Sequence, residues 1–172
     1  MTIRVQFVHG LESSPRSTKA RLFARHFDAL TPAMDTSDFE ACVRAQANAL
    51  ERFAPGVLVG SSFGGGVALA LLQRGLWRGP TLLLAQAALR QGLPAELPPG
   101  IPIWIAHGTR DEIVDPADSR RLAAAGDPSF VRLIEVDDDH PLRACAADER
   151  LVRWIRELAT LAPSRSGRRA GR

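Results

Sequence analysis

A serine flanked by glycines carries the clearest chemistry in this sequence. Residues 60–64 read Gly-Ser-Ser-Phe-Gly, which matches the G-x-S-x-G pattern of a nucleophile elbow. In such an elbow, a strained turn between a strand and a helix presents the serine hydroxyl. Glycine stands on both sides of Ser62 at the second neighbour, whereas Ser61 has Val59 and Phe63 there. Ser62 is therefore the candidate nucleophile.

The same glycines admit two other interpretations. They could form a turn that only lets a helix pack closely on a sheet, or a loop that binds phosphate. A dinucleotide-binding fingerprint has glycine at the position of Ser62, and a P-loop has Gly-Lys-Ser/Thr, which this stretch lacks. The pattern thus disfavours phosphate binding and leaves the packing turn as the alternative to a nucleophile.

A serine hydroxyl needs a base, and the base needs an acid to orient it. In an open parallel sheet such groups gather in the loops at the carboxyl ends of the strands. Of the four histidines, His9 and His107 each precede a glycine at a predicted strand end, where turn formation explains them, and His26 lies within a predicted helix. His140 follows the last predicted strand and is the candidate base. The alternative is a solvated loop histidine beside an acidic turn.

Asp111 is the candidate acid because it lies in the loop after the predicted strand at 101–106. Its alternative role is that of a turn former or helix cap, which is common for aspartate in such loops. Asp115 precedes Pro116 and is better suited to capping a helix. The acidic run at 137–139 is interpreted mostly as a solvated turn.

A tetrahedral oxyanion requires two backbone N–H donors. The first is expected from Phe63, directly after the nucleophile at the start of a helix, where the helix dipole also favours negative charge. The second is expected from Leu11, in the loop after the first strand, next to His9-Gly10. Phe63 and Leu11 are therefore the predicted oxyanion-hole residues.

Strand and helix patterns alternate along the chain and predict an α/β fold. The expected strands are 3–8, 30–34, a short apolar run from 57 that ends at the Gly60 elbow, 81–85, 101–106 and 131–136, and the expected helices are 15–29, 39–53, the elbow helix to about 75, 116–125 and 146–161. Ser14-Pro15 is a typical helix start. Such alternation predicts a three-layer α/β/α sandwich around about six mostly parallel strands in doubly wound order.

Length and charge predict one domain, residues 1–162, followed by a tail. The chain has 172 residues, of which 45% are hydrophobic and 24% charged, as in ordinary globular proteins. The last ten residues contain four arginines and no acid, so the formal net charge of +3 leaves −1 for the rest. Residues 163–172 are predicted to form a disordered basic tail, and the folded body is not expected to bind nucleic acid.

Cysteine usage and hydropathy predict a cytoplasmic protein without a metal site. Cys42 and Cys145 lack the close spacing of metal ligands and are interpreted as buried apolar side chains. No run resembles a signal peptide or a membrane span, so membrane association is not expected.

These residues together resemble the α/β-hydrolase superfamily: Ser62, Asp111 and His140 occur in that family's order. Phe-Val-His-Gly-Leu-Glu-Ser-Ser-Pro-Arg-Ser-x-Lys-Ala (7–20) and Val-Gly-Ser-Ser-Phe-Gly-Gly (59–65) resemble small bacterial esterases of the YqiA type. The resemblance covers about residues 3–160. It implies a Ser-His-Asp hydrolase of small-molecule carboxylic esters, with no metal or organic cofactor.

The chain is short compared with full-sized members of that superfamily. The two leading antiparallel strands are not expected, and the connection at 86–100 has room for little more than a turn where relatives insert a lid domain. An open site would suit small or short-acyl substrates. A thioesterase or peptidase with the same triad, or a catalytically silent binding protein on the same fold, are the alternatives. The sequence predicts no oligomeric state.

Overall fold

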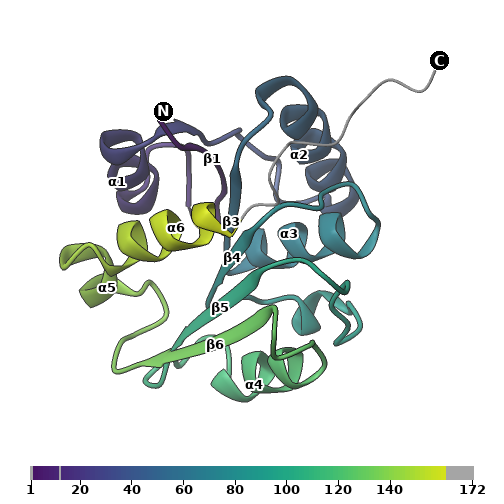
Figure 1. The fold of residues 1–172 in the computed structure, drawn as a ribbon, viewed down its shortest axis with the longest axis vertical. Helices are drawn as coiled ribbons and strands as arrows, with labels where there is room; N and C mark the ends of the chain where they lie inside the picture. Colours follow the sequence, from purple (N-terminus) through teal and green to yellow (C-terminus); the bar gives the residue numbers. More distant parts are fainter. Residues whose placement is uncertain (1, 12, 162–172) are drawn as a thin grey trace.

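Six strands pair side by side in a single parallel sheet (Figure 1). The computed structural model describes residues 2–11 and 13–161. The spatial order is β2-β1-β3-β4-β5-β6, and each neighbouring pair is parallel. The strands are β1 (Arg4–Val8), β2 (Asp28–Leu30), β3 (Val57–Ser61), β4 (Thr81–Leu84), β5 (Ile103–Gly108) and β6 (Val131–Val136).

Helices cover both faces of this sheet and complete the predicted α/β/α sandwich. One face packs against α1 (Thr18–His26), α5 (Arg143–Ala147) and α6 (Arg150–Thr160); the other packs against α2 (Phe39–Phe53), α3 (Phe63–Gln73) and α4 (Pro116–Ala124). Side chains alternate between the two faces along a strand. In β3, Val57 and Val59 belong to the first core and Leu58 to the second.

The strand order reverses between β1 and β3. The chain moves from β1 outward to β2 through α1, then returns past β1 to β3 through α2 on the opposite face. Right-handed crossovers require this change of face when the direction of travel reverses. Such a reversal leaves a crevice at the carboxyl ends of the two central strands, where ligands bind in open α/β sheets.

The connection between β4 and β5 contains only one turn of 3₁₀ helix, η1 (Leu89–Gln91). Within residues 2–11 and 13–161, no lid domain covers the carboxyl edge of the sheet. The prediction of a minimal fold without a lid is therefore confirmed for the described part of the chain.

The second helix agrees with its predicted bounds, whereas the first begins later than predicted. The Asp38 carboxylate caps α2 by accepting a hydrogen bond of 2.9 Å from the Ala41 N–H. The start predicted at Ser14-Pro15 is wrong: α1 begins at Thr18, with Ser17 as its N-cap. The Ser14 carbonyl instead accepts a hydrogen bond from the Ser17 N–H at 3.0 Å, which forms a turn before the helix.

Other elements also differ from prediction, including β5, which spans Ile103–Gly108 rather than 101–106. The second strand lies at Asp28–Leu30 rather than 30–34, because pairing with β1 begins at Asp28 and Pro32 has no N–H to continue the ladder. The last helix is divided into α5 and α6, since Glu149 takes a left-handed conformation with φ 60°. Four apolar residues of α6 are buried: Leu151, Trp154, Ile155 and Leu158.

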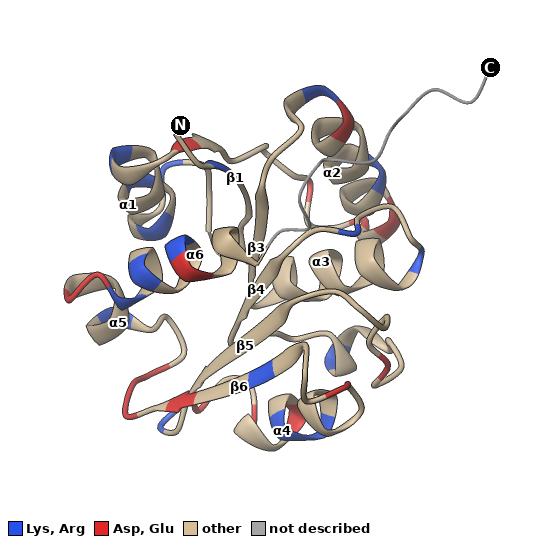
Figure 2. Ribbon diagram, viewed as in Figure 1, with Lys and Arg blue, Asp and Glu red and all other residues tan. Residues whose placement is uncertain are grey.

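Charged residues are absent from the three strands β3, β4 and β5 and gather on the helices and loops (Figure 2). This distribution is typical of parallel strands buried on both faces. Among the described residues, no helix has both the length and the apolar character needed to cross a bilayer. The predicted disordered tail at 163–172 lies outside the described residues.

Truncation of a central core side chain should test this assignment of layers. Leu83 in β4 is fully buried against the α3 side of the sheet. Leu83→Ala should lower the free energy of unfolding by about 2–5 kcal/mol, because it removes buried surface and leaves a cavity. The measurement is urea unfolding followed by circular dichroism.

Leu76 provides the matched control, since it is 50% exposed. Leu76→Ala should change the same free energy by less than about 1 kcal/mol. Equal losses in the two variants would contradict the placement of Leu83 in the core.

Candidate active site

Ser62 occupies a strained turn between β3 and α3. Its backbone angles are φ 55° and ψ −120°, a conformation that costs a non-glycine residue about 1–3 kcal/mol. A Cβ on Gly60 would lie 2.5 Å from the Gly64 carbonyl oxygen, and one on Gly64 would overlap the Val8 carbonyl. Both glycines are therefore required sterically, as the elbow pattern predicts.

The three predicted triad residues meet at the carboxyl edge of the sheet. His140 Nε2 lies 3.0 Å from Ser62 Oγ, and His140 Nδ1 lies 2.7 Å from Asp111 Oδ2. The carboxylate can only accept at this distance, so Nδ1 carries a proton and a neutral ring leaves Nε2 free to accept from the serine hydroxyl. The Asp111 side chain is fully buried, whereas 17% of the His140 side chain is exposed.

Two backbone N–H groups hold the other oxygen of the Asp111 carboxylate. Oδ1 accepts hydrogen bonds from Ile113 at 2.8 Å and from Val114 at 2.9 Å. Burial alone would raise the pKa of Asp111, but the Val114 N–H, His140 and the Ile113 N–H together outweigh it. The pKa therefore lies below its ordinary value, and Asp111 stays ionised beside His140.

Asp138 is the buried member of the acidic run that was interpreted mostly as a solvated turn. Its carboxylate accepts hydrogen bonds from the N–H groups of Asp139 (2.9 Å), Ala144 (3.2 Å) and Cys145 (2.9 Å). Two of these donors belong to the first turn of α5. Asp138 thus ties the loop that carries His140 to the helix that follows it.

The other two acids of this run are placed as predicted, toward solvent. Asp137 forms an exposed ion pair with Arg110, with 2.6 Å between Oδ1 and Nε, and Asp139 pairs with Arg143. Gly108 lets the whole loop cross the end of β5, because a Cβ there would overlap the Asp138 carbonyl.

Of the two residues predicted for an oxyanion hole, Phe63 directly follows Ser62, and Leu11 follows a glycine that lies close to it. Phe63 is the first residue of α3, where N–H groups have no acceptor within the helix. Gly10 passes directly over the nucleophile: a Cβ there would lie 3.4 Å from Ser62 Cβ. Leu11 follows Gly10, and its side chain is 54% exposed. The geometry thus places Phe63 and Gly10 beside Ser62, and it assigns no role to the N–H groups of Phe63 and Leu11.

Three residues set aside by the sequence analysis have defined contacts. His9 Nδ1 lies 2.9 Å from the Gly10 carbonyl oxygen, so it shapes the loop before Leu11. His26 pairs with Glu149 at 3.3 Å. Asp115 caps α4 through the Ala117 N–H at 2.9 Å, as predicted.

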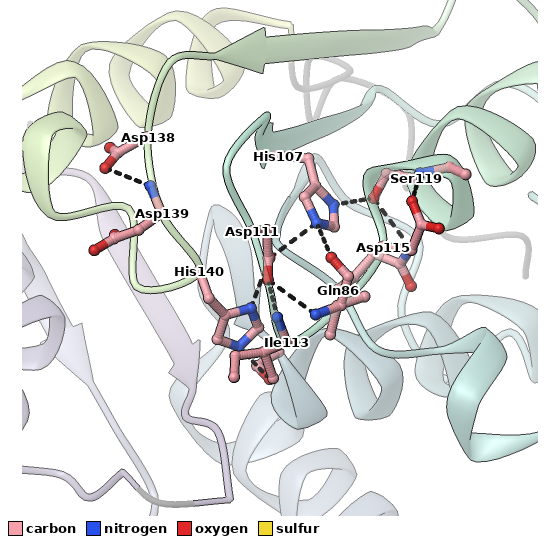
Figure 3. Close-up of polar contacts among 12 residues, drawn as sticks. Gln86, His107, Asp111, Ile113, Asp115, Ser119, Asp138, Asp139 and His140 are labelled. Carbon is pink, nitrogen blue, oxygen red and sulfur yellow. Dashed lines mark hydrogen bonds and ion pairs between the residues drawn. The ribbon is translucent and has the colours of Figure 1, made fainter.

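His107 is more than the turn residue that its Gly108 neighbour suggested. It is fully buried, and its Nε2 lies 3.0 Å from Asp111 Oδ2 (Figure 3). In the sequence, the signal for this contact is a histidine at the end of an apolar strand, four residues before the candidate acid. Whether the two side chains meet depends on the conformation of the loop between them, which the hydrophobic pattern does not predict.

Among the described residues, no group of three or more His, Cys, Asp and Glu side chains is arranged so that it could hold a metal ion. A hollow of about 400 Å³ lies at the amino ends of β5 and β6, at the opposite edge from the triad. Its lining is Pro102, Trp104, Pro128, Ser129, Phe130, Val131, Arg132 and Leu161.

No protein-family model matches the chain, and no curated protein matches its sequence. Solved structures do match. A protein from Xanthomonas campestris pv. campestris, described as a candidate hydrolase of the α/β superfamily, is 26% identical with a TM-score of 0.72 over 93% of this chain and 99% of the other. The esterase domain of a Rhodothermus marinus protein is 19% identical, with a TM-score of 0.68 over 91% and 87% of the two chains.

A monoacylglycerol lipase from Paleococcus ferrophilus is 15% identical, with a TM-score of 0.73 over 92% of this chain and 94% of the other. The protein therefore has an α/β-hydrolase fold, as its sequence predicted. The finer resemblance to esterases of the YqiA type stays a prediction.

Replacement of Asp138 tests whether its carboxylate anchors the loop that carries His140 or only adds charge to the surface. Burial favours the neutral form of this carboxyl, but the N–H groups of Cys145, Asp139 and Ala144 favour the ionised form more and hold the pKa below its ordinary value. The carboxylate therefore stabilises the fold above its unfolded pKa of about 3.9, and this contribution is lost as pH falls through the folded pKa.

Asp138→Asn should thus lower the free energy of unfolding by about 1–3 kcal/mol at pH 7 and by less at pH 3, measured by urea unfolding at both pH values. Asp137→Asn is the matched control, because its side chain is 85% exposed in the same loop. A similar loss in both variants would contradict the anchoring role.

Proposed function

We propose that this protein is a serine hydrolase that cleaves carboxylic esters with small or short acyl groups. The observation that carries the proposal is the pair of hydrogen bonds that joins Ser62 to His140 and His140 to Asp111, at 3.0 and 2.7 Å. The three residues come from different loops, 29 and 78 positions apart along the chain for the two bonds. A packing turn alone gives no reason for this convergence.

In the first step Ser62 Oγ attacks the ester carbonyl carbon. The hydroxyl proton moves to His140 Nε2 as the new C–O bond forms, and the carbonyl oxygen becomes an oxyanion. Asp111 stays ionised and stabilises the positive imidazolium, because its pKa lies below the ordinary value. The electron pair of the oxyanion then re-forms the carbonyl and expels the alkoxide, which takes the proton from His140.

In the second step water removes the acyl group from Ser62. His140 accepts a proton from the water as it attacks, and returns it to Ser62 Oγ when the carboxylic acid leaves. The N–H groups of Phe63 and Leu11 are proposed to donate to the oxyanion in both steps. Loss of one such donor costs about 3–4 kcal/mol of transition-state stabilisation. The reaction uses no metal or organic cofactor.

The proposed preference for short acyl groups rests on the loops around Ser62. The connection from β4 to β5 holds only η1 and supplies no lid over the site. Leu11 and Ile113, whose side chains are 54% and 58% exposed, offer limited apolar surface next to the triad loops. An open site of this kind can shelter a short chain, but most of a long one would stay in water.

Labelling with a fluorophosphonate probe tests the nucleophile. Wild-type protein should be labelled and should hydrolyse p-nitrophenyl acetate, and Ser62→Ala should lose both properties, because the attacking oxygen is gone. Intact-protein mass spectrometry and absorbance assays measure the two. Dialysis against EDTA should leave turnover unchanged.

Ser61→Ala is the matched control, since Ser61 precedes the nucleophile but ends β3. It should retain labelling. Equal labelling of Ser62→Ala and wild type would overturn the proposal, and so would the absence of both labelling and hydrolysis in wild type, which is the result expected of a silent binding protein.

Acyl length and leaving group define the substrate class. Across p-nitrophenyl esters from acetate to palmitate, kcat/KM should be highest for chains of two to four carbons, roughly tenfold or more above palmitate, because the longer chain gains no covered surface. Acyl thioesters and aminoacyl amides should be compared at equal acyl length. A preference for palmitate would contradict the open-site argument, and faster thioester cleavage would replace the ester assignment.

A further inference from the structure

The Asp111 carboxylate lies between two histidines. His140 approaches Oδ2 at 2.7 Å from one side, and His107 Nε2 lies 3.0 Å from the same oxygen on the other (Figure 3). Both the His107 and the Asp111 side chains are fully buried. The proposed catalytic steps use His140 alone, so a second buried imidazole at this oxygen needs its own explanation.

The protonation of His107 follows from its partners. Nε2 also lies 3.0 Å from the Val114 carbonyl oxygen, which can only accept, so this nitrogen carries a hydrogen. The N–H is hydrogen-bonded to that carbonyl and makes a close electrostatic contact with Asp111 Oδ2. Nδ1 lies 2.7 Å from Ser119 Oγ. A neutral ring accepts the serine hydroxyl there and leaves no ring nitrogen unsatisfied.

Gln86 fixes the direction of the Ser119 hydroxyl. Its Oε1 accepts a hydrogen bond from the Ala88 N–H at 2.8 Å, which orients the amide so that Nε2 donates to Ser119 Oγ at 3.2 Å. Ser119 then donates to His107. Gln86, Ser119 and His107 are all fully buried, and an unpaired polar group there would be costly. The chain of donors therefore runs one way, from Gln86 toward Asp111.

Several other charged groups of these loops have partners of their own. Arg110 pairs with Asp137 and Arg143 with Asp139, and Asp138 is satisfied by backbone N–H groups. Burial lowers the pKa of Lys19 to about 8, and the nearby charges of Asp139 and Asp138 oppose this shift. The titratable partners of the Asp111 carboxylate are thus His107 and His140, and the partners of His107 are Asp111, Ser119 and the Val114 carbonyl.

We propose that His107, oriented by Ser119 and Gln86, is a positioning residue that holds Asp111 Oδ2 against His140. Its N–H places positive charge density beside the carboxylate and restricts the oxygen to the side that faces His140. This inference rests on the proposed function. It assigns a role in the reaction to three buried residues that touch no substrate.

The test uses His107→Leu, which removes the N–H, and His107→Gln, whose amide can reach the same position. Rates are normalised to sites titrated with fluorophosphonate, so that misfolded protein does not count. For His107→Leu, kcat should fall about tenfold or more with KM nearly unchanged, because the carboxylate, although still beside His140, is no longer confined to one orientation toward the base. His107→Gln should recover part of the loss.

The pH profile distinguishes positioning from folding. Without the His107 N–H, the Asp111 charge is less compensated and stabilises the imidazolium of His140 more, so the acid limb of kcat/KM should move up by about half a pH unit or more. Ser119→Ala should move it in the same direction, and decides the question if His107→Leu does not fold. Thr81→Val removes a buried hydroxyl at the amino end of β4 and should leave the profile unchanged.

Two failures are separable. Wild-type protein without labelling or turnover refutes the proposed function itself. Active wild type together with an unchanged kcat and acid limb in His107→Leu, or in Ser119→Ala where the first variant does not fold, overturns the inference alone. An equal shift in Thr81→Val overturns it as well.

Discussion

The backbone of Ser62 has a conformation that residues with a side chain rarely adopt, and hydrogen bonds to β4 and the loop that follows it keep it there. Its N–H donates to the Leu84 carbonyl at 2.9 Å, and its carbonyl accepts from the Ala87 N–H at 3.0 Å. Strain of about 1–3 kcal/mol is tolerated because these bonds and the buried β3–α3 core over-determine the turn. Glycines on either side then let β1 and α3 close around it. The hydroxyl is left at the carboxyl edge of the sheet.

Parallel pairing brings the other two side chains to the same edge. Asp111 and His140 follow β5 and β6, whose carboxyl ends point the same way as that of β3. The position of these loops after β5 and β6 does not by itself fix their conformation. Backbone N–H groups hold each loop in place. The N–H groups of Ile113 and Val114 hold the Asp111 carboxylate, and the first turn of α5 holds Asp138 in the loop before His140. Each loop is fixed by its own neighbours in sequence.

Local patterns predicted most of the fold, and they failed where tertiary contacts decide. The elbow and the apolar strands are encoded within a few residues, and both were found. Ser14-Pro15 has the local pattern of a helix start, and only the turn in front of α1 moves the cap to Ser17. The pattern from 146 to 161 is continuous, so nothing local marked the left-handed Glu149 that divides it.

The candidate site could likewise be predicted only in part. Ser62, His140 and Asp111 could be predicted from their order in the chain and their positions at strand ends. The contacts of His107 and Asp138 could not, because they depend on how two loops cross. In a sequence, both look like ordinary turn residues. The Asp138 carbonyl lies against Gly108, a contact between segments about thirty residues apart that no local pattern predicts.

The sheet places the candidate base on its margin. In the described sheet β6 pairs with β5 alone, so the loop that carries His140 follows a strand with a neighbour on one side only. The serine turn, by contrast, follows β3, which is paired on both sides. Fraying of the β6 edge would therefore move the imidazole away from Ser62 before it disturbs the serine turn.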